Sequence, residues 1–143
     1  MSSPARVRLL PRREALTCDI EIPSGLGGAA PGAAVRLLAT VGFDEEGVPR
    51  EVFLCGAKDG SGLAAILDDA SVVISIALQH GVTAAALAKS VARLPERLDG
   101  PAVKAASAIG AVLDLVRGLA PAVEAPAVGA EPRLVLMPQA AKK

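Results

Sequence analysis

Aromatic side chains are nearly absent from this chain of 143 residues, which has two Phe and neither Trp nor Tyr. Proteins that bind single-stranded nucleic acid usually stack the bases on aromatic side chains. The formal net charge is zero, from 15 basic and 15 acidic residues, so no overall field attracts a phosphate backbone or a membrane surface. We therefore expect neither nucleic acid nor a membrane among the partners of this protein.

Histidine and cysteine are also scarce, with one His and two Cys in the chain. Cys18 and Cys55 follow no CxxC spacing, and a disulfide framework normally has more cysteines in a shorter chain, so we expect a reduced pair. A metal site of Cys18, Cys55 and His80 is conceivable if the strands that carry the cysteines are neighbours. The alternative is that the cysteines are small apolar core residues. No nucleophile with an accompanying base is recognisable.

Signals for export or membrane insertion are missing as well. The first residues are basic, but no apolar stretch follows them, as a signal peptide would require. The longest apolar segment contains Asp68 and Asp69, which argues against a membrane-spanning helix. We therefore expect a cytoplasmic protein.

Alternating apolar and polar residues predict three strands in the first part of the chain, at residues 16–22, 35–43 and 50–55. A glycine- and proline-rich connection separates the first two strands at residues 23–32. The acidic segment at residues 44–49 (DEEGVP) is typical of a hairpin turn. This order predicts an antiparallel meander.

The period of the apolar residues becomes helical between Gly62 and Gln79. Ser61 is the expected N-cap, and Gly81 is the expected residue after the helix end. The predicted core-facing stripe consists of Leu63, Ile66, Leu67, Ala70, Ile74, Ala77 and Leu78, widened by Val73, with Val72 and Ile76 buried on a second side.

Two further helices are expected, one from Thr83 to about Arg93 and one from about Gly100 to Arg117. The length fits one domain, which we place at residues 1–118. Its fold class is α+β, a three-stranded antiparallel sheet packed against two to three helices. Residues 119–143 form a flexible Ala/Pro-rich tail, in which residues 133–137 (RLVLM) are a candidate docking strand.

Three segments carry a family resemblance. The hairpin reads D-x-x-G-x-P-x-E-V-F, and it is followed by K-x-G-S and by S-x-A-L-Q-x-G-V. Together with Arg12 and Arg13, these segments resemble the TSCPD domain, best known at the C-terminus of adenosylcobalamin-dependent (class II) ribonucleotide reductases. The resemblance covers roughly residues 8–93. The matching residues are Asp44, Gly47, Pro49, Glu51, Val52 and Phe53, then Lys58, Gly60 and Ser61, then Ser75, Ala77, Leu78, Gln79, Gly81 and Val82.

The resemblance implies a stand-alone accessory domain of the vitamin B12-dependent ribonucleoside-diphosphate reductase system. Its implied role is in deoxynucleotide supply, by docking to the ribonucleotide reductase catalytic chain or by binding a nucleotide. The chain lacks the Thr-Ser-Cys-Pro-Asp motif of the family, the catalytic barrel and the C-terminal cysteine pair. We therefore expect no catalytic residue and no cofactor in this chain, and adenosylcobalamin would belong to the associated reductase. The alternative is a non-enzymatic interaction module for an unrelated partner, homodimeric through an exposed sheet edge.

The best candidate site in the sequence is a nucleotide or phosphate cradle formed by Lys58, Gly60, Ser61 and Gly62. This segment places backbone N–H groups, an ammonium and a hydroxyl at the start of a helix, where anions are commonly bound. The short KxGSG run lacks the full P-loop spacing, so the alternative is a strand-to-helix corner capped by Ser61.

Two charged clusters complete the candidates. Asp44, Glu45 and Glu46 form either a cation site or an ordinary solvated turn. The arginines of residues 1–15, namely Arg6, Arg8, Arg12 and Arg13, form either a contact for nucleic acid or an acidic partner, or a loose solvated arm.

Overall fold

A three-stranded antiparallel sheet is the centre of the fold in the computed structural model, which describes residues 4–22, 35–95 and 99–121. Strands β1 (Ala15–Ile22), β2 (Val35–Phe43) and β3 (Pro49–Cys55) lie in the order β1-β2-β3, which confirms the predicted meander. Pro49 is tolerated because it is the first residue of its strand. The predicted tail, including residues 133–137, lies outside the described residues.

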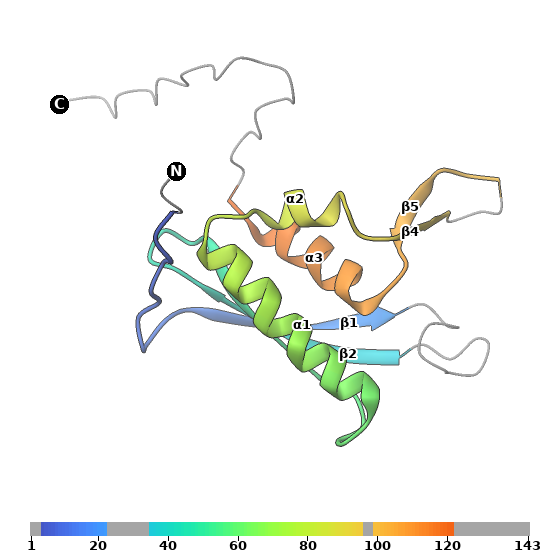
Figure 1. The fold of residues 1–143 in the computed structure, drawn as a ribbon, viewed down its shortest axis with the longest axis horizontal. Helices are drawn as coiled ribbons and strands as arrows, with labels where there is room; N and C mark the ends of the chain where they lie inside the picture. The colour runs from blue at the N-terminus through green and yellow to red at the C-terminus, as the bar shows by residue number, and fades with distance from the viewer. Residues whose placement is uncertain (1–3, 23–34, 96–98, 122–143) are drawn as a thin grey trace, which may run out of the picture.

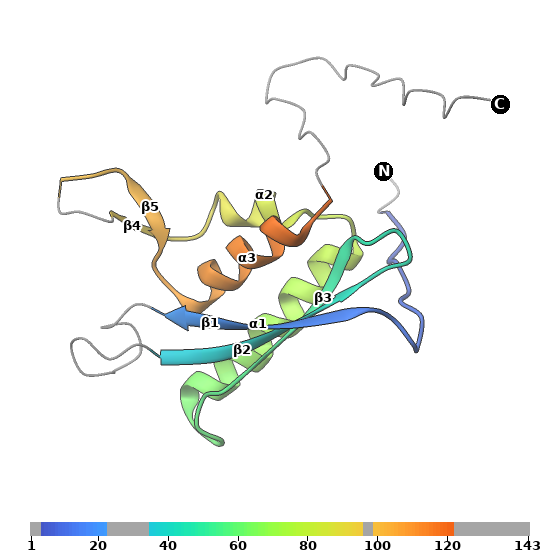
Figure 2. The ribbon, with the colours of Figure 1, turned by 180° about the vertical axis from the view of Figure 1, so that it is seen from behind.

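The helices cover one face of this sheet. Helix α1 (Gly62–Gln79) lies in front of the strands in Figure 1 and behind them in Figure 2, and it packs on β3. Helix α3 (Ala108–Leu119) packs against β1 and against the short helix α2 (Ala84–Ala88). The core lies between these layers, and its most buried large side chains are Leu37, Val41, Val52, Leu67, Val112, Leu113 and Val116. The α+β fold class is therefore confirmed.

The predicted bounds of the second and third helices were wrong. Helix α2 ends at Ala88, and the chain continues into a separate hairpin of β4 (Arg93–Pro95) and β5 (Ala102–Ala105) before α3 begins. The Arg93 guanidinium ends α2 by donating to the carbonyl oxygen of Ala88 at 3.2 Å and to Asp114 at 2.7 Å. Ser107 then starts α3 by accepting a hydrogen bond from Gly110 N at 3.2 Å, as an N-cap does.

Helix α1 has the predicted ends but a different buried face. Ser61 Oγ accepts a hydrogen bond from Ala64 N at 3.1 Å, and Gly81 follows the helix with a φ of 86°. The predicted stripe is correct at Leu67, Ile74 and Leu78, which are buried. It is wrong at Ile66 and Val73, whose exposed fractions are 58% and 66%, and the expected second buried side is also wrong, because Val72 and Ile76 are exposed.

The position of α1 beside the last strand explains this difference. The helix packs on β3 and has little contact with α3, so most of its surface has no neighbour among the described residues. By length and composition alone α1 would pass as a membrane-spanning helix, with a mean hydropathy of 1.6, although core helices of soluble proteins meet the same criterion. Only 28% of its residues are buried, which leaves an apolar face uncovered.

Two serines of α1 close the outer edge of β3. Val52 N donates to Ser75 Oγ at 2.9 Å, and Leu54 N donates to Ser71 Oγ at 3.1 Å. Ser75 Oγ in turn lies 3.2 Å from the carbonyl oxygen of Val52. Because these backbone groups are already bonded, another strand cannot pair with β3, which excludes this edge for the homodimer of the alternative interpretation.

Candidate functional site

Asp44 organises the turn between β2 and β3. Its Oδ1 accepts hydrogen bonds from the backbone N–H groups of Glu46 and Val48, each at 2.9 Å. Gly47 has a φ of 77°, a conformation that favours glycine. Burial by itself would raise the pKa of Asp44, but the hydrogen bonds from Arg50, Val48 and Glu46 lower it below the ordinary value of an aspartate. Asp44 is therefore a structural carboxylate.

Arg50 joins this turn to the end of α1. Its Nε donates to Asp44 Oδ2 at 2.9 Å, and its Nη1 donates to the carbonyl oxygen of Leu78 at 2.8 Å. Both side chains of the ion pair are largely buried, with exposed fractions of 18% and 13%. The pair therefore fixes the hairpin against the C-terminal end of the helix.

The N-terminal arm (residues 4–14) also packs here, which corrects the expectation of a loose arm. Val7 N donates to the carbonyl oxygen of Gln79 at 2.8 Å, and Arg6 Nε donates to Gln79 Oε1 at 2.6 Å. Arg13 forms an ion pair with Glu51, whose side chain lies over Gly42. A Cβ at position 42 would be 2.6 Å from Glu51 Cγ, so a larger residue there would displace the Glu51 side chain.

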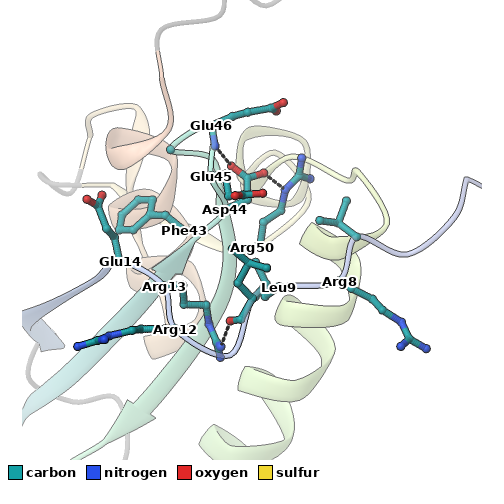
Figure 3. A pocket seen from close by; sticks show the side chains of 13 residues that line it. Arg8, Leu9, Arg12, Arg13, Glu14, Phe43, Asp44, Glu45, Glu46 and Arg50 are labelled. Carbon is teal, nitrogen blue, oxygen red and sulfur yellow. Dashed lines mark hydrogen bonds and ion pairs between the residues drawn. The ribbon is translucent and has the colours of Figure 1, made fainter.

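A cavity of about 560 Å³ lies between the arm and the hairpin. Its volume is in the range of small-molecule sites. The charged side chains that line it are balanced in sign, and Arg50 is paired with Asp44. They are Arg8, Arg12, Arg13, Arg50, Glu14, Asp44, Glu45 and Glu46. Figure 3 shows Arg8 and Arg12 extending away from the acidic turn in different directions, so they do not converge on one point. This arrangement favours neither an anion nor a cation.

No metal centre is formed by the predicted ligands. Within residues 4–22, 35–95 and 99–121, no group of three His, Cys, Asp or Glu side chains is placed to hold a metal ion. The strands that carry Cys18 and Cys55 are not neighbours, because β2 lies between β1 and β3. His80 Nδ1 lies 3.2 Å from the carbonyl oxygen of Pro4, so the histidine is part of the joint between the arm and α1.

The residues Lys58, Gly60, Ser61 and Gly62 form the corner between β3 and α1. Ser61 N donates to the carbonyl oxygen of Lys58 at 3.0 Å, and Gly60 has a φ of 73°. Lys58, Gly60 and Gly62 are exposed. The first N–H groups of α1, at Gly62 and Leu63, have no carbonyl partner within the helix and can receive an anion. The structure brings the predicted residues together in one turn, and phosphate binding there stays a prediction.

A second depression of about 360 Å³ follows the outer edge of β3 where it meets α1. Phe53 of β3 and Val72 and Ile76 of α1 supply its exposed apolar lining, and Asp68 and Arg6 supply charge. Phe53 has an exposed fraction of 55%, although it is one of only two aromatic residues in the chain. We call Phe53, Val72 and Ile76 the α1–β3 apolar face.

The family model of the TSCPD domain matches residues 14–118, which is well over half of the chain. The chain belongs to the TSCPD domain family. The match continues through α3, beyond the segments that carry the resemblance in the sequence. A search of curated proteins and a search of solved structures gave no match.

Most residues that match the family pattern have a structural task in this TSCPD domain. Asp44 and Gly47 form the turn, and Glu51 binds Arg13 of the arm. Ser75 closes the β3 edge, and Gln79 binds the arm. Phe53 differs from them, because its side chain is exposed and packs into no core. Among the matching residues, Phe53 is therefore the best candidate for contact with another molecule.

Sequence reasoning missed two polar links that hold this TSCPD domain together. One is the closure of β3 by Ser71 and Ser75, whose spacing of four residues within an apolar helix was the available signal. The other is the ion pair of Arg93 with Asp114, for which no signal exists because the two residues are distant in sequence. Hydrogen bonds from Arg93 lower the pKa of Asp114 below its ordinary value, against the opposing effect of burial.

Proposed function

We propose that this TSCPD domain is a non-catalytic accessory domain that docks to a larger protein. The partner that its family resemblance implies is the catalytic chain of an adenosylcobalamin-dependent ribonucleotide reductase. In that setting the domain would contribute to deoxynucleotide supply by binding the reductase. Membership of the TSCPD family supports this proposal.

The α1–β3 apolar face is the observation that carries the docking proposal. Val72 and Phe53 have exposed fractions of 57% and 55%, although exposing such side chains to water is unfavourable. Interface centres are enriched in aromatic residues, and a few such residues usually supply most of the binding free energy. A face with an exposed Phe beside two exposed aliphatic side chains, Val72 and Ile76, therefore fits a protein partner.

Adenosylcobalamin would be held by the reductase, because the described residues of this domain do not fit it. His80 is the only histidine in the chain, it contacts the carbonyl oxygen of Pro4, and it lines neither cavity. The larger cavity is lined by charged side chains that are partly paired with one another. We therefore assign no step of the cofactor chemistry to this chain.

The docking proposal is tested by measuring the affinity of the purified domain for the reductase catalytic chain of its source cell. Loss of a central aromatic side chain typically costs about 2 kcal/mol of binding free energy, so we expect Phe53→Ala to weaken binding roughly thirtyfold. Val72→Asp should weaken it further by placing a charge in the interface. Val103→Asp is the matched control, because Val103 has an exposed fraction of 55% but lies on β5.

Each outcome of this experiment has a meaning. If the wild-type domain does not bind, the reductase is not the partner, and a pull-down from native lysate would show whether another protein is. If the domain binds and Phe53→Ala has no effect, the α1–β3 apolar face is not the docking surface. The isolated domain, incubated with ribonucleotide, adenosylcobalamin and a dithiol, should form no product above a control without protein.

Nucleotide binding at the Lys58–Gly62 corner is the second way in which the domain would act on a reductase. The exposed Lys58 ammonium and the first N–H groups of α1 favour a phosphate there. Millimolar ATP or dATP should then shift the amide signals of Gly60 and Gly62, and Lys58→Gln should weaken the shift. Unchanged signals would leave the corner as a purely structural turn.

A further inference from the structure

The outer edge of β1 has unpaired backbone groups. Phe43 N donates to the carbonyl oxygen of Glu14 at 3.0 Å, and the register then continues from Ala15 opposite Gly42 to Ile22 opposite Val35. Bonded and non-bonded pairs alternate in an antiparallel ladder, so the N–H and C=O groups of Thr17 and Asp19 point away from β2. No described residue pairs with them as a strand. The two edges of the sheet therefore differ, since Ser71 and Ser75 close the β3 edge.

The side chains of β1 also lack cover. Leu16 lies on the face that packs against the helices, yet its exposed fraction is 42%, and Cys18 beside it is only half-buried. Farther along the same face, Ile20 and Ile22 are buried. On the opposite face Asp19 is exposed, and among the described residues it has no salt bridge, whereas Glu21 pairs with Arg36. The edge thus lacks a strand, apolar cover near Leu16 and a cation near Asp19.

We propose that residues 133–137 of the same chain (RLVLM) bind this edge as a fourth strand. Pro132 and Pro138 bracket the segment, and proline is typical of the ends of an edge strand because it cannot donate to a ladder. The segment lies beyond Pro121, the last described residue, and eleven residues separate the two. A linker of that length spans up to about 36–40 Å, which exceeds twice the ~13 Å radius of gyration of a domain this size.

The alternation of the segment fits the needs of the edge. Side chains of a strand point to opposite faces in turn, so Leu134 and Leu136 share one face and Arg133 lies on the other. Placing the leucines beside Leu16 and Cys18 puts Arg133 on the face of Asp19. One register therefore supplies both the missing apolar cover and the missing positive charge.

A second copy of the chain is the competing occupant. The charged residues of β1 are Asp19 and Glu21, both acidic and both on the open face. Pairing two copies of β1 would bring like charges onto the same face, which is unfavourable. The tail segment brings an arginine instead, so charge favours the tail.

Hydrogen exchange of the full-length protein tests the proposal. We expect the amides of Thr17 and Asp19 to exchange at least about tenfold faster after Leu134→Pro or Val135→Pro, because proline breaks the added strand. Both variants are needed, because successive N–H groups of a strand point in opposite directions, so only one of the N–H groups of Leu134 and Val135 faces β1. Proline removes a hydrogen bond to β1 only at that residue. Val128→Pro is the matched control in the linker and should have no effect, and the Cys18 and Ile20 amides, which pair with β2, should stay protected in every variant.

Exchanging the charges of Arg133 and Asp19 distinguishes direct docking of the tail segment from an indirect effect of the proline substitutions. Arg133→Asp should speed exchange at Thr17, and the double variant Asp19→Arg with Arg133→Asp should restore its protection. Exchange of Thr17 and Asp19 at the unprotected rate in the wild-type chain would overturn the proposal. Protection that survives both proline variants would also overturn it, and if that protection rises with protein concentration, the occupant is a second copy. None of these outcomes depends on the reductase.

Discussion

The hairpin end of the molecule and the α1–β3 apolar face lie close together. They differ in whether their side chains have partners within the domain. At the hairpin end, Asp44, Arg50 and Glu51 each have a charged partner, and the N-terminal arm binds Gln79. On the apolar face, Phe53 and Val72 face solvent. The family-like segments contribute to both regions, so a family pattern by itself does not distinguish residues that hold the fold from residues left free for a partner. Substitutions at the hairpin end should therefore lower the stability of the fold, whereas substitutions on the apolar face should lower binding to a partner and leave stability nearly unchanged.

The largest loss of stability is expected from Gly42→Val in the hairpin region. A Cβ at this position meets Glu51, so the substitution displaces the carboxylate that binds Arg13. Overpacking and the loss of a partly buried ion pair together should cost about 3 kcal/mol of unfolding free energy. Urea unfolding measures this loss. Gly118→Ala is the control, since a Cβ there meets nothing within 4 Å, and a loss of similar size in the control would contradict the packing argument.

A comparable experiment separates Phe53 from its neighbour Leu54. Leu54→Ser should cost about 3 kcal/mol because Leu54 is buried, with an exposed fraction of 4%. Phe53→Ser should change the unfolding free energy by less than about 1 kcal/mol, because its side chain faces solvent. Thermal unfolding of both variants gives the comparison. Equal destabilisation would mean that Phe53 serves the fold and not a partner.

Opening the β3 edge should have a smaller effect. Ser75→Ala leaves Val52 N without its partner, and an unsatisfied, mostly buried N–H costs about 1–3 kcal/mol. Ser90→Ala is the control, because Ser90 is exposed. Chemical denaturation measures the difference, and a loss below about 0.5 kcal/mol for Ser75→Ala would show that water replaces the hydroxyl. Exchange of the Val52 amide should also become faster in this variant.

The smallest expected effect is a pH dependence of the turn. The pKa of Asp44 is lower in the folded protein than its ordinary value of about 4, so its contribution to stability is present above that value. This contribution is lost as the pH falls through the folded pKa. The difference in unfolding free energy between the wild-type protein and Asp44→Asn should therefore shrink as the pH is lowered below about 4. A constant difference between pH 7 and pH 3 would contradict this account of Asp44.

Local patterns were enough to predict the sheet and the ends of α1. The three strands alternate, and the turn, the N-cap Ser61 and the glycine after the helix each have a local chemical signal. The buried face of α1 was not predictable from its own sequence, because apolar residues occur around much of the helix. Which side is covered depends on its place beside β3, a tertiary contact.

The second and third helices show the same limit. Residues 100–107 include alanines that favour a helix, but Arg93 binds Ala88 and Asp114 and holds the chain in the β4–β5 hairpin. For the candidate site, the residues of the Lys58–Gly62 corner were placed together correctly because they are adjacent in sequence. The apolar face was missed because it joins β3 to α1, and its members look like ordinary core residues in the sequence.

The docked N-terminal arm has a practical consequence for anyone who prepares this protein. Arg6 is held against Gln79 and also lines the depression that contains Phe53 and Ile76. Removing the arm would therefore take away one side of that depression together with the contacts with Gln79. Binding measurements should use protein in which residues 4–14 are intact.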